Sequence, residues 1–158
     1  MNTVTIRWAT EADIDAVVAI VRCCWAPIYE GYGQILGTEL YNAIAPDPLQ
    51  AKSDSVTYAV KQGRTFVAES NGVICGFAGF LVNGTIGSII SNAVLPEYKG
   101  RGIAGLLYTR IFEELRQRGC TVATVHTGLD DGHAAARSAY QKMGFEVGLP
   151  GIDYYKKL

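Results

Sequence analysis

Two Asn-Gly pairs, Asn71-Gly72 and Asn83-Gly84, constrain the fold of this chain more than any other feature of its sequence. Each pair stands between runs that are rich in branched and aromatic residues, at 65–70, 73–82 and 85–95. Asn-Gly between such runs is the strongest short-range signal for a hairpin with a tight type I′ turn. The sequence therefore predicts a three-stranded antiparallel meander.

Regular elements are also predicted before this meander. The periodicity predicts a strand over 3–8, a helix that begins after Thr10, and a helix that begins at Pro48 and reaches residue 62. Proline and glycine are frequent over 27–48, so a short or broken second helix is expected there instead of one long helix.

A helix and a strand are predicted directly after the meander. The helix begins at Ile103 and ends before Gly119, and a compact strand follows over 120–127. A strand, a helix and a strand of this length predict a parallel, right-handed crossover. The pattern then predicts a helix over 133–143 and two closing strands, over 145–148 and 152–156. The apolar face of the crossover helix consists of Ile103, Leu106, Leu107, Ile111 and Leu115.

Length and charge limit the class of protein. A chain of 158 residues predicts one domain over 1–158, large enough to bury a core. The 14 Lys and Arg residues nearly balance the 15 Asp and Glu residues, so net charge gives no support for nucleic acid or a membrane surface as a partner. No apolar run could span a bilayer, and Met1–Thr5 lacks the features of a signal peptide. We therefore expect a cytoplasmic protein.

The spacing of cysteine and histidine predicts no metal site. The two histidines, His126 and His133, stand seven residues apart without a convincing third ligand. The cysteines show no paired CxxC spacing, so we expect small apolar side chains that stay reduced. They are Cys23, Cys24, Cys75 and Cys120.

The segment from Val94 to Leu107 predicts a strand end, a basic glycine-rich loop and the first turn of a helix. Such a junction directs unpaired N–H groups and the positive end of a helix dipole at one spot, which favours an anion. Gly100 and Gly102 would let the backbone approach a phosphate closely, and Lys99 and Arg101 would add positive charge.

Two ligands suit this junction. Gly100 to Gly105 matches the dinucleotide pattern GxGxxG, and the same residues suit the pyrophosphate of coenzyme A. In a dinucleotide fold the glycines follow the first strand almost at once, and a long parallel sheet comes after them. Here Pro96 to Lys99 intervenes, the preceding strand is antiparallel, and too little chain follows. The coenzyme A interpretation is therefore favoured.

At this point the chain resembles the GCN5-related N-acetyltransferases, the GNAT family. Their acetyl-coenzyme A loop reads Arg/Gln-x-x-Gly-x-Gly/Ala after a Val-x-Pro-x-Tyr strand exit, and this chain has Val94-Leu95-Pro96-Glu97-Tyr98 followed by Lys99 to Ala104. Their second landmark is an Asn-x-x-Ala helix that ends in Tyr-x-Lys-x-Gly-Phe. The similar residues here are His133 to Ala136 and Tyr140 to Phe145. The chain departs from the pattern at Lys99 and at His133, which stands in place of Asn.

The resemblance implies an α/β (α+β) fold, with a mixed central sheet, an antiparallel meander, a parallel β-α-β crossover, splayed central strands and helices on both faces. It implies an N-acetyltransferase that moves acetyl from acetyl-CoA directly to a primary amine of a small molecule or a peptide. A non-catalytic acyl-CoA-binding sensor is the alternative. Homodimers are common in proteins of this kind. The implied cofactor-binding residues are Ala93, Val94, Leu95, Lys99, Gly100, Arg101, Gly102, Ile103, Ala104, Gly105, His133 and Tyr140.

The resemblance also implies catalytic roles. The Val94 N–H would polarise the thioester carbonyl. Tyr140 would protonate the leaving thiolate, although its helical spacing alone also suits a core residue. No acid occupies 88–94, where many relatives carry a Glu that serves as the base. Candidates for that role are His126, a water oriented by Asn92, and Glu30 or Asp131 entering from loops.

The aromatic segment from Trp25 to Tyr41 corresponds to the acceptor side in this family. Tyr29, Glu30 and Tyr32 are therefore candidate substrate-binding residues. Packing of aromatic side chains onto the sheet is an equally good interpretation of the same segment.

Overall fold

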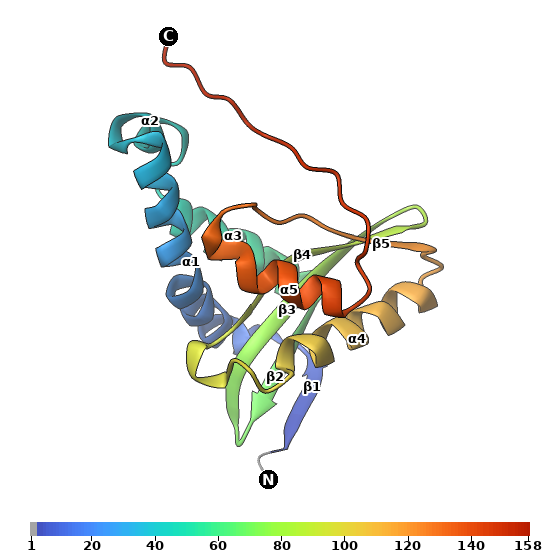
Figure 1. The fold of residues 1–158 in the computed structure, drawn as a ribbon. Coiled ribbons are helices and arrows are strands. Elements are labelled where there is room, and N and C mark those ends of the chain that lie inside the picture. The colour runs from blue at the N-terminus through green and yellow to red at the C-terminus, as the bar shows by residue number, and fades with distance from the viewer. Residues whose placement is uncertain (1–2) are drawn as a thin grey trace.

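The computed structural model describes residues 3–158, so Met1 and Asn2, part of the segment compared with a signal peptide, lie outside the described residues. A five-stranded mixed sheet forms the centre, in the order β1-β2-β3-β4-β5 (Figure 1). All neighbouring strands are antiparallel except β4 and β5, which are parallel and joined through α4, as predicted. The strands are β1 (Val4–Trp8), β2 (Thr65–Ser70), β3 (Val73–Asn83), β4 (Ile86–Val94) and β5 (Val122–Val125).

Helices cover both faces of the sheet, and each face has its own buried cluster. Phe66, Phe80 and Ile89 pack with α4 and α5 on one face, whereas Val67 and Phe77 pack with α1 and α3 on the other. Phe66 and Val67 are neighbours on β2, so strand alternation sends them to opposite faces. The helices are α1 (Ile14–Leu36), α2 (Thr38–Ile44), α3 (Pro48–Lys61), α4 (Ile103–Gln117) and α5 (Ala134–Lys142). Within the described range, no helix has the length and apolar character needed to cross a membrane.

The two predicted hairpins both form, but their turns differ. Asn71 and Gly72 have φ of 52° and 76°, the two positive values that a type I′ turn requires. In the second hairpin, Asn83 is still paired with Ile86, so the loop consists of Gly84 and Thr85 and only the glycine has positive φ. The type I′ prediction is therefore wrong for the second turn, because the strand pairing extends one residue further than expected.

Helix α1 is one continuous helix of 23 residues that runs through Pro27, which contradicts the predicted break. Proline removes the hydrogen bond to the carbonyl four residues earlier, at Cys23. Both Pro27 and Cys23 are exposed, so water can satisfy that carbonyl. The helix ends at Gly37, whose φ is 77°, and the short helix α2 follows.

The predicted closing strands over 145–148 and 152–156 are absent, and the chain after Lys142 has no regular structure. Phe145 packs against Phe112 and Tyr140, but most apolar side chains beyond it, such as Val147 and Leu149, are exposed. The segment leaves the sheet edge and extends past α2 (Figure 1). Alternation alone could not reveal that this segment lacks a partner strand.

A β-bulge interrupts β4. Gly79 is paired with Ser91 and Phe80 with Ile89, so Ile90 is an extra residue without a partner on β3. A bulge changes which side chains share a face. Ile89 faces the cluster under α4, and after the bulge Asn92 faces that same side, three residues further on, which regular alternation would forbid.

The N-terminal end of the fold depends on a partly buried ion pair. Arg7 donates two hydrogen bonds of 2.8 Å to the carboxylate of Asp13, which also accepts from the backbone N–H of Thr10. Hydrogen bonding from Arg7 lowers the pKa of Asp13 well below its usual range, although burial opposes this effect. The pair therefore stabilises the fold above the ordinary pKa of an aspartate, and this contribution is lost as pH falls toward the lowered value.

We expect Asp13→Asn to lower the free energy of unfolding by about 2 kcal/mol at neutral pH, because the charged hydrogen bonds weaken. The difference from the wild type should shrink in strong acid, where Asp13 itself becomes protonated. Urea unfolding at neutral pH and in strong acid measures the difference in free energy of unfolding, and the variant Asp15→Asn, at an exposed residue, is the control. A variant as stable as the wild type at neutral pH would contradict this account.

Candidate active site

The last residues of β4 have no hydrogen-bonded partner strand on the side of β5. The parallel pairing covers Ile86 to Ile89 on β4 and ends at Val125 on β5, but β4 continues to Val94. The Leu95 N–H donates to the Cys75 carbonyl on β3 at 2.9 Å. Because backbone groups alternate sides along a strand, the N–H of Val94 points away from β3, toward the side that β5 has left. This confirms the splayed central strands.

The glycine loop lies at the end of this opening. Gly100 and Gly102 both have φ of 76°, a conformation that favours glycine, and nothing stands within 4 Å of where a Cβ would be. The first backbone hydrogen bond of α4 runs from Leu106 N–H to the Gly102 carbonyl. The N–H groups of Ile103 to Gly105 are therefore left for another acceptor, as at any helix start. The loop has room for an anion and donors for it.

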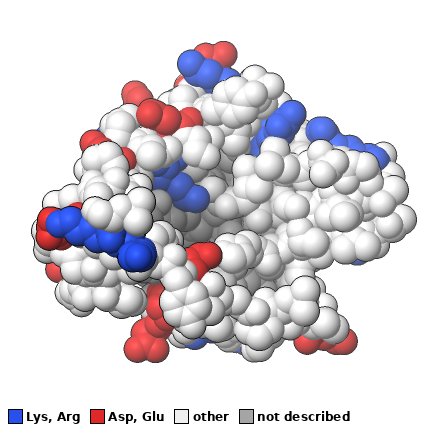
Figure 2. Space-filling view, turned by 90° about the horizontal axis from the view of Figure 1, so that it is seen from above, with Lys and Arg blue, Asp and Glu red and all other residues white. Residues whose placement is uncertain are grey.

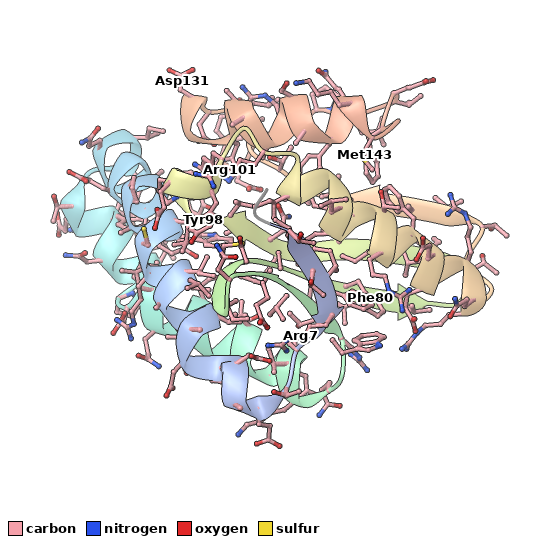
Figure 3. The ribbon with its side chains drawn as sticks, turned by 90° about the horizontal axis from the view of Figure 1, so that it is seen from below. Arg7, Phe80, Tyr98, Arg101, Asp131 and Met143 are labelled. Atoms are coloured by element: carbon pink, nitrogen blue, oxygen red, sulfur yellow. The ribbon has the colours of Figure 1, made fainter. Side chains whose placement is uncertain are left out.

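Arg101 and Lys99 give this loop its charge, and Arg101 also gives it rigidity. The Arg101 guanidinium donates to the Glu97 carbonyl at 2.9 Å and lies 5.1 Å from the ring of Tyr98. Figure 3 shows Arg101 and Tyr98 together at the turn between β4 and α4. The Lys99 N–H donates to the Pro96 carbonyl, which closes the short 3-10 turn (Pro96–Tyr98) before the loop.

Tyr140 comes to β4 from α5, a helix far along the chain. The Asn92 amide nitrogen donates to the Tyr140 hydroxyl at 2.9 Å, and the Tyr108 hydroxyl donates to the Asn92 amide oxygen at 2.6 Å. The exposed fraction of Tyr140 is 6%, so it is both a core residue and a neighbour of the open strand edge. The structure thus brings together two predicted site residues, Asn92 and Tyr140.

Tyr108 is a site residue that the sequence analysis missed. The apolar face predicted for α4 included Leu106, which is 46% exposed, whereas Tyr108 is 2% exposed. Tyr108 lies three residues before Ile111 and seven before Leu115, both buried, so helical periodicity could have placed it on this face. The polar hydroxyl of Tyr108 is the signal that this position does more than fill the core.

His133 lies at the start of α5, seven residues before Tyr140. Its Nδ1 is within 2.8 Å of the Asp130 carboxylate, and its ring stacks 6.2 Å from that of Tyr32. Burial acts to raise the pKa of Asp130, but the hydrogen bond and charge of His133 outweigh it and lower that pKa. Arg137 donates to the carbonyls of Gly128 and Asp130, which fixes this turn. His133 is therefore held rigidly.

His126 directly follows Val125, the last residue of β5, at the point where the two strands part. Its side chain is exposed. Two residues earlier on the strand, the Thr124 hydroxyl is 2.8 Å from that of Ser88 on β4.

A tyrosine-lined groove of about 820 Å³ lies between α1, α2 and α3. Tyr29 and Tyr32 line it, together with Tyr41 and Tyr155, which were not among the predicted site residues. Glu30 lines an adjoining hollow of about 460 Å³. Figure 2, viewed from the side of α2 and the C-terminal end, shows a hollow with basic atoms on one wall and acidic atoms on the opposite one.

Burial keeps the phenols of Tyr29, Tyr32 and Tyr41 neutral at physiological pH. Burial raises the pKa of Tyr29 to about 12, with smaller contributions from Tyr41 and Tyr32. Burial also raises the pKa values of Tyr32 and Tyr41. The Tyr41 hydroxyl is buried and has no hydrogen-bond partner among the described residues. The groove thus offers aromatic faces to a ligand.

Cys24 is the thiol that lies near the open end of β4. Its Sγ contacts the Val94 carbonyl oxygen at 3.7 Å. Burial, together with the neighbouring Cys23, raises the pKa of Cys24 to about 11. Because the thiolate and not the thiol is the nucleophile, Cys24 is poorly suited to take up an acyl group at neutral pH.

A mixed sheet whose parallel strand pair parts beside a glycine loop is the fold of the GNAT acetyltransferases. The family model described as acetyltransferase (GNAT) family matches residues 36–145, and the chain belongs to this family. A curated acetyltransferase from Pectobacterium atrosepticum is 35% identical over 81 residues, which is 51% of this chain and 56% of that protein. The match thus spans little more than half of that relative's length.

Solved structures support the same fold. The PaiA N-acetyltransferase from Thermoplasma acidophilum, determined in complex with coenzyme A, has a TM-score of 0.73 at 16% identity, over 92% of this chain and 91% of that one. An aminoglycoside 6′-N-acetyltransferase from Acinetobacter haemolyticus has a TM-score of 0.68 at 18% identity, over 98% and 99%. At these identities the likeness confirms the α/β fold with its mixed sheet.

We expect Gly102→Ala to weaken acetyl-CoA binding by at least about tenfold, because the Cβ opposes the left-handed backbone that aims the N–H groups. Gly119→Ala is a matched control, since Gly119 has φ of 80° at the other end of α4. Both variants should lose roughly 1 kcal/mol of stability. Calorimetric titration measures the affinity for acetyl-CoA. If Gly119→Ala weakened acetyl-CoA binding as much as Gly102→Ala, the glycine loop would not be the pyrophosphate site.

Proposed function

We propose that this protein transfers acetyl from acetyl-CoA directly to a primary amine of a small molecule or a peptide. One observation carries the proposal: the backbone of β4 opens beside Asn92 and Tyr140, directly before the glycine loop. The loop suits the pyrophosphate, and the open edge suits the pantetheine amides, which would bind near Ala93 to Leu95 like an added strand.

The reaction assigns a task to each group at the opening. The N–H of Val94 polarises the thioester carbonyl, and the amine nitrogen attacks the carbonyl carbon. As the C–S bond breaks, its electron pair goes to sulfur, which receives the proton of Tyr140, and the proton that the amine nitrogen loses goes to the base, for which His126 is the candidate. The high pKa of Cys24 supports direct transfer to the amine without an acyl-cysteine.

The remaining cofactor contacts follow the motif. The backbone of Gly100 to Gly105 holds the pyrophosphate, with Lys99 and Arg101 supplying charge. His133 stands where the family has Asn and contacts the coenzyme through Nε2, since Nδ1 faces Asp130.

The cytoplasmic location, the single domain over 1–158, a homodimer, and the absence of nucleic-acid and membrane partners stay predictions.

The groove beside α2 is the proposed acceptor site. Its aromatic faces at Tyr29 and Tyr32 and the nearby carboxylate of Glu30 would attract a cationic amine. The relative from Acinetobacter haemolyticus is an aminoglycoside acetyltransferase, which supports a small-molecule amine as acceptor.

The release of free thiol from acetyl-CoA tests the proposed function. We expect turnover that depends on the amine, across a panel of mono- and polycationic small molecules and a peptide with a free N-terminus. A protein that binds acetyl-CoA but shows no amine-dependent release would be a sensor, and the proposed function would be wrong.

Tyr140→Phe should lower turnover at least about tenfold, because the leaving sulfur loses its proton donor. The affinity for acetyl-CoA should change by less than about twofold, since the ring is retained. Steady-state kinetics and titration measure the two effects. The exposed Tyr58→Phe on α3 is the control, and normal turnover in Tyr140→Phe would remove Tyr140 as the acid.

His126→Ala should also lower turnover at least about tenfold, if His126 takes the proton of the incoming amine. Added imidazole should restore part of the activity. Thr124→Ala, on β5 two residues before His126, should leave turnover nearly unchanged. Full activity in His126→Ala would show that another group or a water is the base.

A further inference from the structure

A chain of hydrogen bonds joins α4, β4 and α5 beneath the open strand edge. The Tyr108 hydroxyl donates to the Asn92 amide oxygen at 2.6 Å, and the Asn92 amide nitrogen donates to the Tyr140 hydroxyl at 2.9 Å. The two phenol rings are 5.6 Å apart and tilted by 40°. Both tyrosines are buried, with exposed fractions of 2% and 6%.

Tyr108 determines which way the Asn92 amide faces. A tyrosine hydroxyl has one proton to donate, and Asn92 is the partner that the structure provides for it. If the amide were reversed, its nitrogen would face Tyr108 and the buried proton of Tyr108 would lose the amide oxygen as its acceptor, which is unfavourable. Burial, with smaller contributions from Tyr140, raises the pKa of Tyr108 well above the usual range, so this donor persists at all working pH values.

The orientation of Asn92 decides in turn what Tyr140 can do. Because Asn92 presents an N–H, the Tyr140 oxygen accepts a hydrogen bond and its own proton is not used by Asn92. An acceptor at the same place would draw that proton inward and away from the reaction. The N–H of Asn92 would also stabilise the negative charge that develops on the phenol oxygen as its proton leaves.

We propose that Tyr108 and Asn92 are positioning residues that direct the Tyr140 proton toward the leaving sulfur. The inference rests on the proposed function, in which Tyr140 is the acid. When the C–S bond breaks, sulfur takes the electron pair and the Tyr140 proton, and the N–H of Asn92 holds the phenolate until solvent reprotonates it. The bulge at Ile90 places Asn92 on the face of α4 and α5. Asn92 is also two residues from Val94, so one strand orients the proton donor and polarises the carbonyl.

Two conservative variants test the chain of hydrogen bonds. Asn92→Asp keeps the size of the side chain, but a carboxylate can only accept hydrogen bonds, so it would take the proton of Tyr140 as well as that of Tyr108. This variant should therefore lower kcat at least about tenfold. Tyr108→Phe removes the donor that fixes the amide and should lower kcat at least about threefold. In both variants the KM for acetyl-CoA should stay within about twofold of the wild-type value.

A double-mutant cycle separates positioning from a general structural effect. In the Tyr140→Phe background, Tyr108→Phe should cause no further loss of kcat, because the proton that it helps to direct is absent. The exposed Tyr58→Phe serves as the control in both backgrounds. Thermal unfolding of each variant confirms that it is folded.

Three outcomes overturn the inference. Equal losses of kcat from Tyr108→Phe in both backgrounds, or Asn92→Asp with wild-type kcat, would show that these residues do not act through Tyr140. Normal kcat in Tyr140→Phe would also overturn it and would remove the acid itself. Failure of the proposed function is distinct from all three, since the wild-type protein would then show no amine-dependent thiol release.

Discussion

The β-bulge at Ile90 is the constraint on which the site depends. Without it, regular alternation would keep Ile89, Ser91 and Ala93 on the α4 side and turn Asn92 toward α1. With it, Asn92 meets two phenols, and the pairing with β5 stops at the same place. One inserted residue thus turns Asn92 toward Tyr140, and the backbone of β4 beyond it has no strand partner on the side of β5.

The two halves of the site use different physical means. On the proposed acyl-donor side, the thioester carbonyl and the pyrophosphate would meet backbone groups, namely the N–H of Val94 and those at the start of α4, so this part of the site depends on φ values and strand pairing. The proposed acceptor side, the tyrosine groove, consists of side chains carried by α1, α2 and α3, above all Tyr29 and Tyr32. Side chains can change without altering the fold, and this division lets one fold hold a constant acyl donor beside varied amines.

Features set by short-range chemistry were predicted well. The Asn-Gly pairs indicated the meander, and the spacing of strand, helix and strand indicated the parallel crossover. The positions of the glycine loop before α4 and of Tyr140 on α5 followed from motifs, whereas the roles of these residues stay predictions. What was missed depends on distant partners: α1 continues through Pro27 because water can reach the freed carbonyl, and residues 145–158 have no strand to pair with. The link from Tyr108 to Asn92 joins residues 16 apart through a bulge that no local pattern reveals.

The extended C-terminal segment has a practical consequence. Tyr155 lines the tyrosine groove, and Lys157 is paired with Glu39 on α2, so this end of the chain lies beside the proposed entrance for amines. The described N-terminal end lies on the opposite side of the molecule (Figure 1). An affinity tag or fusion partner attached after Leu158 would therefore crowd the acceptor groove, whereas one attached before Val4 would leave it open.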